Sequence, residues 1–105
     1  MSVAVGIGLV AVAGVRESLH AHGERYVNRI YTDAEQRDCR SDPRCLATRF
    51  AAKEATAKAL RVGAGALPWH SIGVVQDADG RPSIRLTGEA AGLAEQRGMK
   101  FSTSA

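Results

Sequence analysis

The sequence is poor in aromatic residues, and its first acidic residue is Glu17. Aromatic side chains make up 5% of the 105 residues, whereas hydrophobic residues make up 45%. We therefore expect Val, Ile, Leu and Ala to fill the core. The net charge of +3 is mildly basic, which suits a polyanionic partner such as a nucleotide or an acidic protein. Because no basic run is interleaved with aromatic residues, we expect no DNA or RNA partner.

The chain also lacks a long hydrophobic run. Its apolar start, residues 3–15, is too short to span a membrane and lacks the basic region of a signal peptide. We therefore expect a cytoplasmic protein with no membrane partner. Two cysteines, Cys39 and Cys45, lie in a polar segment. Without an export signal we expect both to be free thiols, and their spacing and the absence of a second pair argue against a zinc site.

No internal repeat, linker or low-complexity segment divides the sequence, so we expect a single domain covering residues 1–105. The near-continuous apolar run at residues 3–12 is typical of a strand that is buried on both faces. Apolar spacing and turn residues define the remaining elements. We expect helices at 15–22, 32–39 and 44–62, helical spacing at 24–31, hairpin strands at 69–76 and 82–87, a helix at 88–97 and a strand at 99–104.

Local signals mark where the helices begin and end. Thr32 and Glu35 form a capping box, and Pro43 is well placed in the first turn of the next helix. Gly63 and Gly65 end that helix. The resulting order, β-α-α-α-β-β-α-β, predicts an α+β fold.

The most informative stretch reads RFAAKEATAKAL at residues 49–60. It places Glu54 and Lys58 four residues apart, on one face of the long helix. Taken alone, such a pair is a common surface feature with a small stabilising effect. The longer string resembles the central signature of the holo-[acyl-carrier-protein] synthases, which are small phosphopantetheinyl transferases.

The resemblance extends over nearly the whole chain. Further similar segments are Arg29-Ile30-Tyr31-Thr32 with Glu35, Trp69 with Ile72 and Val74, Gly80-Arg81-Pro82, Leu86-Thr87-Gly88, and residues 101–104. Members of this family transfer the phosphopantetheine arm of coenzyme A (CoA) to a serine of an acyl carrier protein. Magnesium bridges the pyrophosphate, and the active sites lie between the subunits of a trimer. The resemblance therefore implies a homotrimer that uses CoA, Mg²⁺ and an acyl carrier protein.

The resemblance also implies roles for individual residues. Glu54 would hold the metal ion, and Lys58 would lie beside the phosphates of CoA, so that these two residues carry the catalysis. The implied cofactor-binding residues are Arg49, Lys53, Gly63 and Gly65.

The two ends of the chain depart from the family pattern. The family reads Gly-Ile-Gly-Ile-Asp-Ile-Val-Glu-Ile where residues 4–12 read AVGIGLVAV. Gly8 thus replaces the second metal carboxylate, and Ala11 replaces the following Glu. Magnesium requires hard oxygen ligands in near-octahedral order, so we expect Glu54 alone to bind it weakly. Ala105 stands where the family has His, and we expect the last family strand to be absent.

Three functions are compatible with this sequence. In the first, the metal site is degraded, standard transfer is lost, and the pocket serves acid/base chemistry at Glu54 or binds carrier-linked acyl or polyketide intermediates. In the second, the chain is a working phosphopantetheinyl transferase with an altered metal shell. In the third, it is a non-catalytic scaffold that needs only the fold and the trimer interface.

Overall fold

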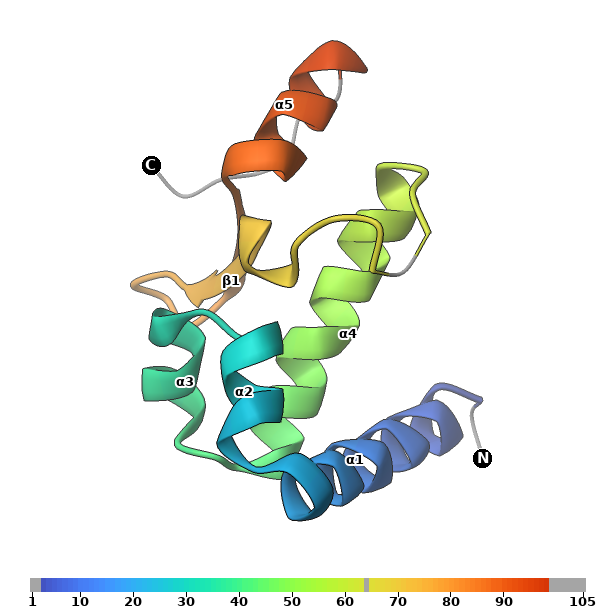
Figure 1. The fold of residues 1–105 in the computed structure, drawn as a ribbon, viewed down its shortest axis with the longest axis vertical. Helices are drawn as coiled ribbons and strands as arrows, with labels where there is room; N and C mark the ends of the chain where they lie inside the picture. Colours follow the sequence, from blue (N-terminus) through green and yellow to red (C-terminus); the bar gives the residue numbers. More distant parts are fainter. Residues whose placement is uncertain (1–2, 64, 99–105) are drawn as a thin grey trace. The chain divides into compact units, whose positions relative to one another are not determined.

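The computed structural model of the chain describes residues 3–63 and 65–98, with side chains from residue 11 onward. The predicted α+β class is confirmed, because the described residues form five α-helices and one two-stranded antiparallel sheet (Figure 1). The chain divides into two compact units, residues 1–51 and residues 52–105, and each is described by itself. The strand predicted at 99–104 lies outside the described residues.

The first unit is helical. It contains α1 (Val3–His22), α2 (Glu24–Ile30), α3 (Asp33–Cys39) and the first part of α4 (Pro43–Ala59). Gly23 separates α1 from α2 with a φ of 53°, a left-handed conformation that glycine adopts without steric cost. The backbone carbonyl of Gly23 accepts a hydrogen bond from the Val27 N–H at 3.3 Å, so the second helix begins directly after the break.

The strand predicted at residues 3–12 is wrong, because α1 runs without a break from Val3 to His22. A short apolar run cannot be assigned to strand or helix by periodicity alone. No turn residue pair separates this run from the helix predicted at 15–22. A helix satisfies its own backbone hydrogen bonds, whereas a strand needs a partner, so the two predicted elements merge into one helix.

The capping box predicted at the start of α3 is confirmed. The Thr32 hydroxyl accepts from the Glu35 N–H at 3.2 Å, and the Thr32 N–H donates to Glu35 Oε1 at 2.8 Å. The chain then reverses through Arg40 and Ser41, with φ values of 49° and 62°. Pro43 lies in the first turn of α4, as predicted. The helix ends at Ala59 rather than at the predicted residue 62, because Arg61 adopts a left-handed φ of 60° before the glycines are reached.

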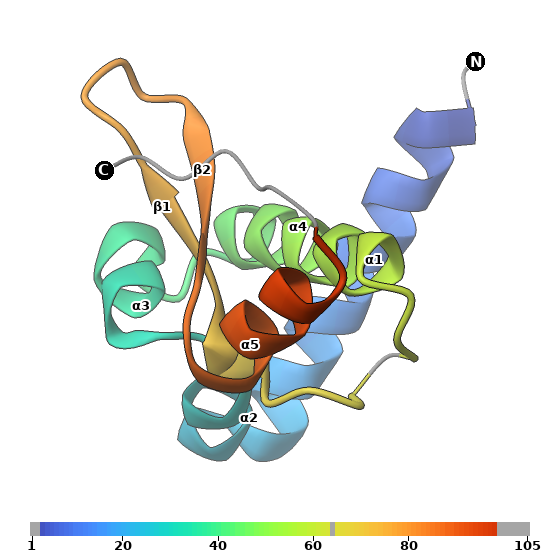
Figure 2. The ribbon, with the colours of Figure 1, turned by 90° about the horizontal axis from the view of Figure 1, so that it is seen from above.

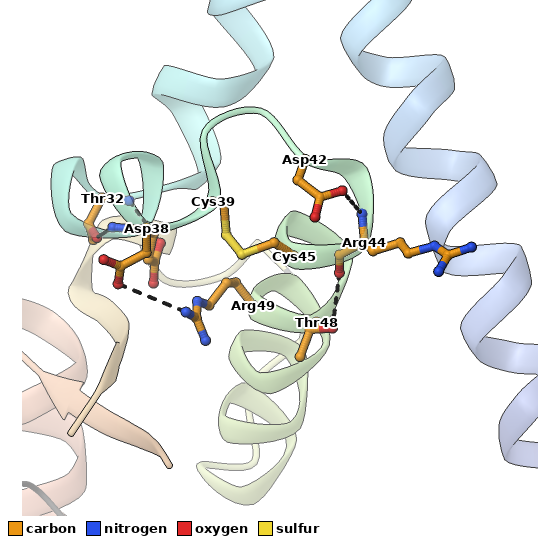
Figure 3. The surroundings of a disulfide bond; sticks show 9 residues. Thr32, Asp38, Cys39, Asp42, Arg44, Cys45, Thr48 and Arg49 are labelled. Carbon is orange, nitrogen blue, oxygen red and sulfur yellow. Dashed lines mark hydrogen bonds and ion pairs between the residues drawn. A yellow bond between two sulfur atoms is a disulfide. The ribbon is translucent and has the colours of Figure 1, made fainter. Parts of the chain in front are cut away.

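The prediction of two free thiols is wrong, because Cys39 and Cys45 form a disulfide (Figure 3). Cys39 is the last residue of α3, and Cys45 lies in the first turn of α4. The reversal between the two helices brings their Cα atoms to 5.3 Å, a distance that a disulfide spans readily. The prediction rested on the lack of an export signal and on the short separation of the cysteines, whereas the pairing follows from the geometry of the turn.

The second unit is built on a hairpin. It contains the remainder of α4, a 3₁₀ turn η1 (Trp69–Ser71), β1 (Ile72–Gln76), β2 (Pro82–Leu86) and α5 (Gly88–Gln96). The two strands lie side by side in antiparallel register, with Ile72 opposite Leu86 (Figure 2). The predicted hairpin is therefore confirmed, except that the residues from Trp69 to Ser71 form the 3₁₀ turn rather than the start of a strand.

An aliphatic cluster forms the core of this second unit. Its buried members are Ala57, Leu60, Ile72, Ala90 and Ala94, and the partly buried Val62, Leu67, Ile84, Leu86 and Leu93 pack against them. Among the described residues, no aromatic side chain belongs to this cluster, so the predicted aliphatic core is confirmed in this unit. In the first unit, by contrast, the aromatic Tyr31 is completely buried. In residues 3–63 and 65–98 no helix has both the length and the apolar content that a membrane crossing requires.

Candidate functional site

Helix α4 carries both residues for which a catalytic role was predicted. Glu54 is partly buried and Lys58 is exposed, and their spacing places both side chains on the same side of the helix. Within the part of the chain that the structure describes, no ion pair joins them. A carboxylate and an ammonium one helical turn apart are therefore both open to a ligand.

Lys53, the residue before Glu54, lies in a different environment. Its side chain has 0% of its surface exposed. Its ammonium Nζ donates to the backbone carbonyl of Trp69 at 3.0 Å and to that of Ile72 at 2.7 Å. Lys53 thus donates two hydrogen bonds to the polypeptide of its own unit, and its side chain is not exposed to solvent.

The position of Lys53 on the apolar stripe was a signal that the sequence analysis missed. Leu46, Lys53 and Leu60 recur every seven residues, and Leu46 and Leu60 are completely buried. A residue on this stripe faces the interior, because seven residues are close to two helical turns. The burial of Lys53 could therefore have been predicted, although its hydrogen-bond acceptors could not.

Arg49 belongs to the first unit, and its side chain is buried there. Its Nη2 lies 3.9 Å from Oδ2 of Asp38, whose side chain is 41% exposed. Its Nε is buried and has no hydrogen-bond partner among the residues that the structure describes. Figure 3 shows this guanidinium beside the disulfide between Cys39 and Cys45. The structure thus gives Arg49 a contact within the α3–α4 region, and its role toward a cofactor stays a prediction.

The loop after α4 contains the two glycines that were predicted to bind a cofactor. Both Gly63 and Gly65 are exposed. Gly65 has a φ of 80°, and a Cβ at either glycine would meet no atom of the described residues within 4 Å. The Gly63 carbonyl accepts from the Ala66 N–H at 3.0 Å. The loop therefore offers open backbone, and its ligand role remains a prediction.

The donor set for a metal ion is small. Glu54 is the only carboxylate among the predicted site residues, and among the described side chains no three His, Cys, Asp or Glu residues gather as a metal site would require. Gly8, which was predicted to replace the second metal carboxylate, lies within α1, and Ala11 lies about one turn further along. The predicted site residues whose side chains the structure describes do not by themselves supply the several oxygen ligands that magnesium prefers.

A pair of tyrosines in the first unit is a second feature that the sequence analysis missed. The hydroxyl groups of Tyr26 and Tyr31 are 2.7 Å apart, and the rings meet edge to face with centroids 5.6 Å apart. Burial raises the pKa of the Tyr26 phenol above its usual value of 10.0, and the hydrogen bond to Tyr31 opposes part of this shift.

Comparison with known proteins places these residues in a family context. The family model of the 4′-phosphopantetheinyl transferase superfamily matches residues 4–102. A holo-[acyl-carrier-protein] synthase of Chloroflexus aurantiacus is 46% identical, covering 90% of this chain and 80% of the relative. The synthases of Desulforudis audaxviator and Chlorobaculum tepidum are 40% and 44% identical, covering 94% and 78% of this chain and 78% and 74% of those relatives.

Proposed function

Because the chain belongs to the 4′-phosphopantetheinyl transferase superfamily, we propose that it binds the phosphopantetheine group of CoA or of an acyl carrier protein on the face of α4 that carries Glu54 and Lys58. The observation that supports this site is the pairing of a partly exposed carboxylate with an exposed ammonium one turn later. Lys58 contributes the positive charge that attracts a phosphate. Glu54 contributes a carboxylate beside it.

Magnesium-dependent transfer is weak or lost in this proposal. Phosphoryl transfer depends on cations that neutralise charge on the phosphates, and Glu54 lacks the partner carboxylate that Gly8 replaces. The pocket instead serves proton transfer at Glu54 or holds an acyl or polyketide intermediate on its carrier. A carboxylate that is free of a metal ion can donate or accept a proton.

A working phosphopantetheinyl transferase is the second candidate. The identity of 46% to a holo-[acyl-carrier-protein] synthase over 90% of the chain favours it. In this case Glu54 would hold the magnesium ion, and the phosphates of CoA would have to supply oxygen ligands that the described side chains lack.

A mass measurement separates the two candidates. The protein is incubated with CoA, Mg²⁺ and an apo carrier protein, alongside the variants Gly8→Asp and Gly8→Asp/Ala11→Glu. The proposal expects little modification of the carrier by the natural chain and more by the two variants, because each adds oxygen ligands. Rapid modification by the natural chain, with no gain in either variant, would establish the second candidate.

Binding of CoA is tested independently by calorimetry. Lys58→Met removes the predicted phosphate contact and is expected to weaken CoA binding about tenfold or more, since a charged hydrogen bond is lost. Arg81→Met is the matched control, because Arg81 is also an exposed cation of the second unit but lies in the hairpin turn. Equal affinities of the two variants for CoA would show that Lys58 does not contribute to the CoA site.

We also propose that the protein is a cytoplasmic homotrimer. A chain of 105 residues buries only a modest core by itself, and symmetric assembly adds buried surface. Light scattering at micromolar concentration tests the assembly, and a stable monomer would contradict it.

A further inference from the structure

Lys53 joins α4 to the start of the hairpin through two charged hydrogen bonds. Its acceptors, the carbonyls of Trp69 and Ile72, belong to η1 and to the first residue of β1. A hydrogen bond from an ammonium is roughly twice as strong as one between neutral groups. The buried Lys53 side chain therefore binds the backbone of this turn at two residues, Trp69 and Ile72.

The turn that Lys53 holds is itself closely bonded. The Pro68 carbonyl accepts from both the Ser71 hydroxyl, at 2.6 Å, and the Ser71 N–H, at 2.9 Å. The Ser71 carbonyl in turn accepts from the Thr87 N–H at 2.9 Å, and Thr87 is the N-cap residue of α5. The segment from Pro68 to Ile72 thus connects α4, the hairpin and the start of α5 within the second unit.

Lys53 and Glu54 are neighbours on α4, about 100° apart around the helix axis. Glu54 is partly exposed, whereas Lys53 has no exposed surface. A ligand that contacts Glu54 from solvent cannot reach the Lys53 ammonium while the turn is in place. The turn, which presents the exposed His70, is fixed to the same stretch of helix that carries Glu54.

We propose that Lys53 is a positioning residue, which anchors the turn from Trp69 to Ile72 on α4 and so shapes the surface beside Glu54, rather than a residue that contacts the ligand. This inference rests on the proposed CoA site at Glu54 and Lys58. It assigns Lys53 to the architecture of the site and leaves Lys58 as the cation that meets the phosphates.

Hydrogen exchange of the whole protein tests the anchoring without any activity. Lys53→Met keeps a long apolar side chain but removes all donors. We expect exchange at the Ile72 and Thr87 amides to accelerate about tenfold or more, because both donate into the anchored turn. The Asp77 amide, which donates to Arg81 in the far turn of the hairpin, is the internal control. An equal acceleration at all three amides, or none, would overturn local anchoring.

Calorimetry with CoA distinguishes positioning from direct contact. We expect Lys53→Met to weaken CoA binding and Lys53→Arg, which retains charge and donors, to restore both the affinity and the amide protection. Loss of CoA binding in Lys53→Met with unchanged exchange at Ile72 and Thr87 would mean that Lys53 contacts the ligand, and would overturn the proposal. If Lys53→Met does not fold, Lys53→Gln, which keeps a donor amide, replaces it in the hydrogen-exchange and calorimetry measurements. The results that support or overturn the proposal are then the same as for Lys53→Met.

The two proposals can fail separately. If the natural chain does not bind CoA, the proposed function fails, whereas the exchange rates of the Lys53 variants still decide whether the turn is anchored. If CoA binds and Lys58→Met weakens it, but Lys53→Met changes neither exchange nor affinity, only the positioning role fails.

Discussion

The two units of the chain are stabilised by different kinds of interaction. In residues 11–51, a disulfide joins α3 to α4, a capping box starts α3, and two tyrosine hydroxyls share a hydrogen bond. In residues 52–98, an aliphatic cluster forms the core, and the Lys53 ammonium and the Arg97 guanidinium donate to backbone carbonyls. The disulfide makes the stability of the first unit depend on redox state, whereas the aliphatic cluster makes the stability of the second unit depend on apolar packing. The two units should therefore respond to different perturbations.

Replacing a buried leucine with alanine has the largest expected effect on the free energy of unfolding, and each unit offers one such leucine. Leu46 and Leu60 are both completely buried, and removing a buried leucine side chain costs about 2–5 kcal/mol. We expect Leu60→Ala to lower the free energy of unfolding by about 3 kcal/mol, because Leu60 belongs to the aliphatic cluster. Urea unfolding followed by the fluorescence of Trp69, the single tryptophan, measures this effect in the second unit.

Leu46→Ala tests whether the two units unfold separately. If the units unfold separately, this variant shifts the transition seen by circular dichroism more than the transition seen by Trp69 fluorescence. Coincident shifts in both probes would show one cooperative transition and would break the distinction between the units. A loss below about 1 kcal/mol for Leu60→Ala would contradict the core assignment.

Reduction of the disulfide should have the next largest effect. The bond closes a short loop, with six residues of sequence separation between Cys39 and Cys45, and the entropy of such a loop corresponds to about 2 kcal/mol. We expect reductant to lower the free energy of unfolding by that amount in the natural chain. Cys39→Ser/Cys45→Ser is the control, since it should show the lower stability in both the presence and the absence of reductant.

An equal response of the natural chain and the serine variant to reductant would mean that the disulfide does not stabilise the first unit. Mass measurement after thiol alkylation, before and after reduction, verifies the redox state of each sample. The fluorescence of Trp69 reports whether the second unit is affected.

Local signals in the sequence were sufficient for the elements that depend on neighbouring residues. The capping box at Thr32, Pro43 at the start of α4 and the hairpin after Ile72 each follow from a short pattern with a direct physical cause. The strand predicted at residues 3–12 was wrong because strand formation depends on residues that are distant in the sequence. A strand is stable only beside a partner, and no pattern within an apolar run identifies that partner.

The candidate site shows the same limit. The spacing of Glu54 and Lys58 predicted a shared helix face, because helix geometry alone determines it. The contacts of Lys53 with residues 16 and 19 positions away depend on tertiary folding, as does the pairing of Cys39 with Cys45 across the Arg40–Ser41 reversal. Motif similarity placed Lys53 near a cofactor, whereas its completely buried side chain is explained by the apolar stripe on which it lies.

Helix capping provides a smaller test of the comparison, with a matched threonine in each unit. Thr32 accepts a hydrogen bond from the Glu35 N–H, whereas Thr87 at the start of α5 makes no capping hydrogen bond with its side chain. We expect Thr32→Ala to cost about 1 kcal/mol and Thr87→Ala only a few tenths of that value. Urea midpoints of the two variants measure the difference, and equal losses would show that the capping box contributes nothing specific.

The smallest expected effect is a pH dependence that arises in the first unit. Burial raises the pKa of Tyr26 above 10.0, because the phenolate is disfavoured away from water. Below pH 10 the phenol is protonated in both the folded and the unfolded chain, so it adds no pH dependence. As the pH rises above 10, the unfolded chain loses this proton before the folded chain does, and the free energy of unfolding falls.

Tyr26→Phe isolates this contribution, because phenylalanine keeps the ring that meets Tyr31 edge to face but has no proton to release. Urea midpoints of both proteins at about pH 9 and about pH 11 give the two pH dependences. We expect the natural chain to lose more stability over this interval than the variant does, although the variant starts from a lower value because the hydrogen bond between the two hydroxyls is gone. Groups outside the tyrosine pair that titrate at alkaline pH affect both proteins equally and cancel in the comparison, so the measured difference belongs to the Tyr26–Tyr31 pair. An identical pH dependence would show that the Tyr26 phenol is as well solvated in the folded chain as in the unfolded one, and the tyrosine pair would then stabilise the first unit by ring contact alone.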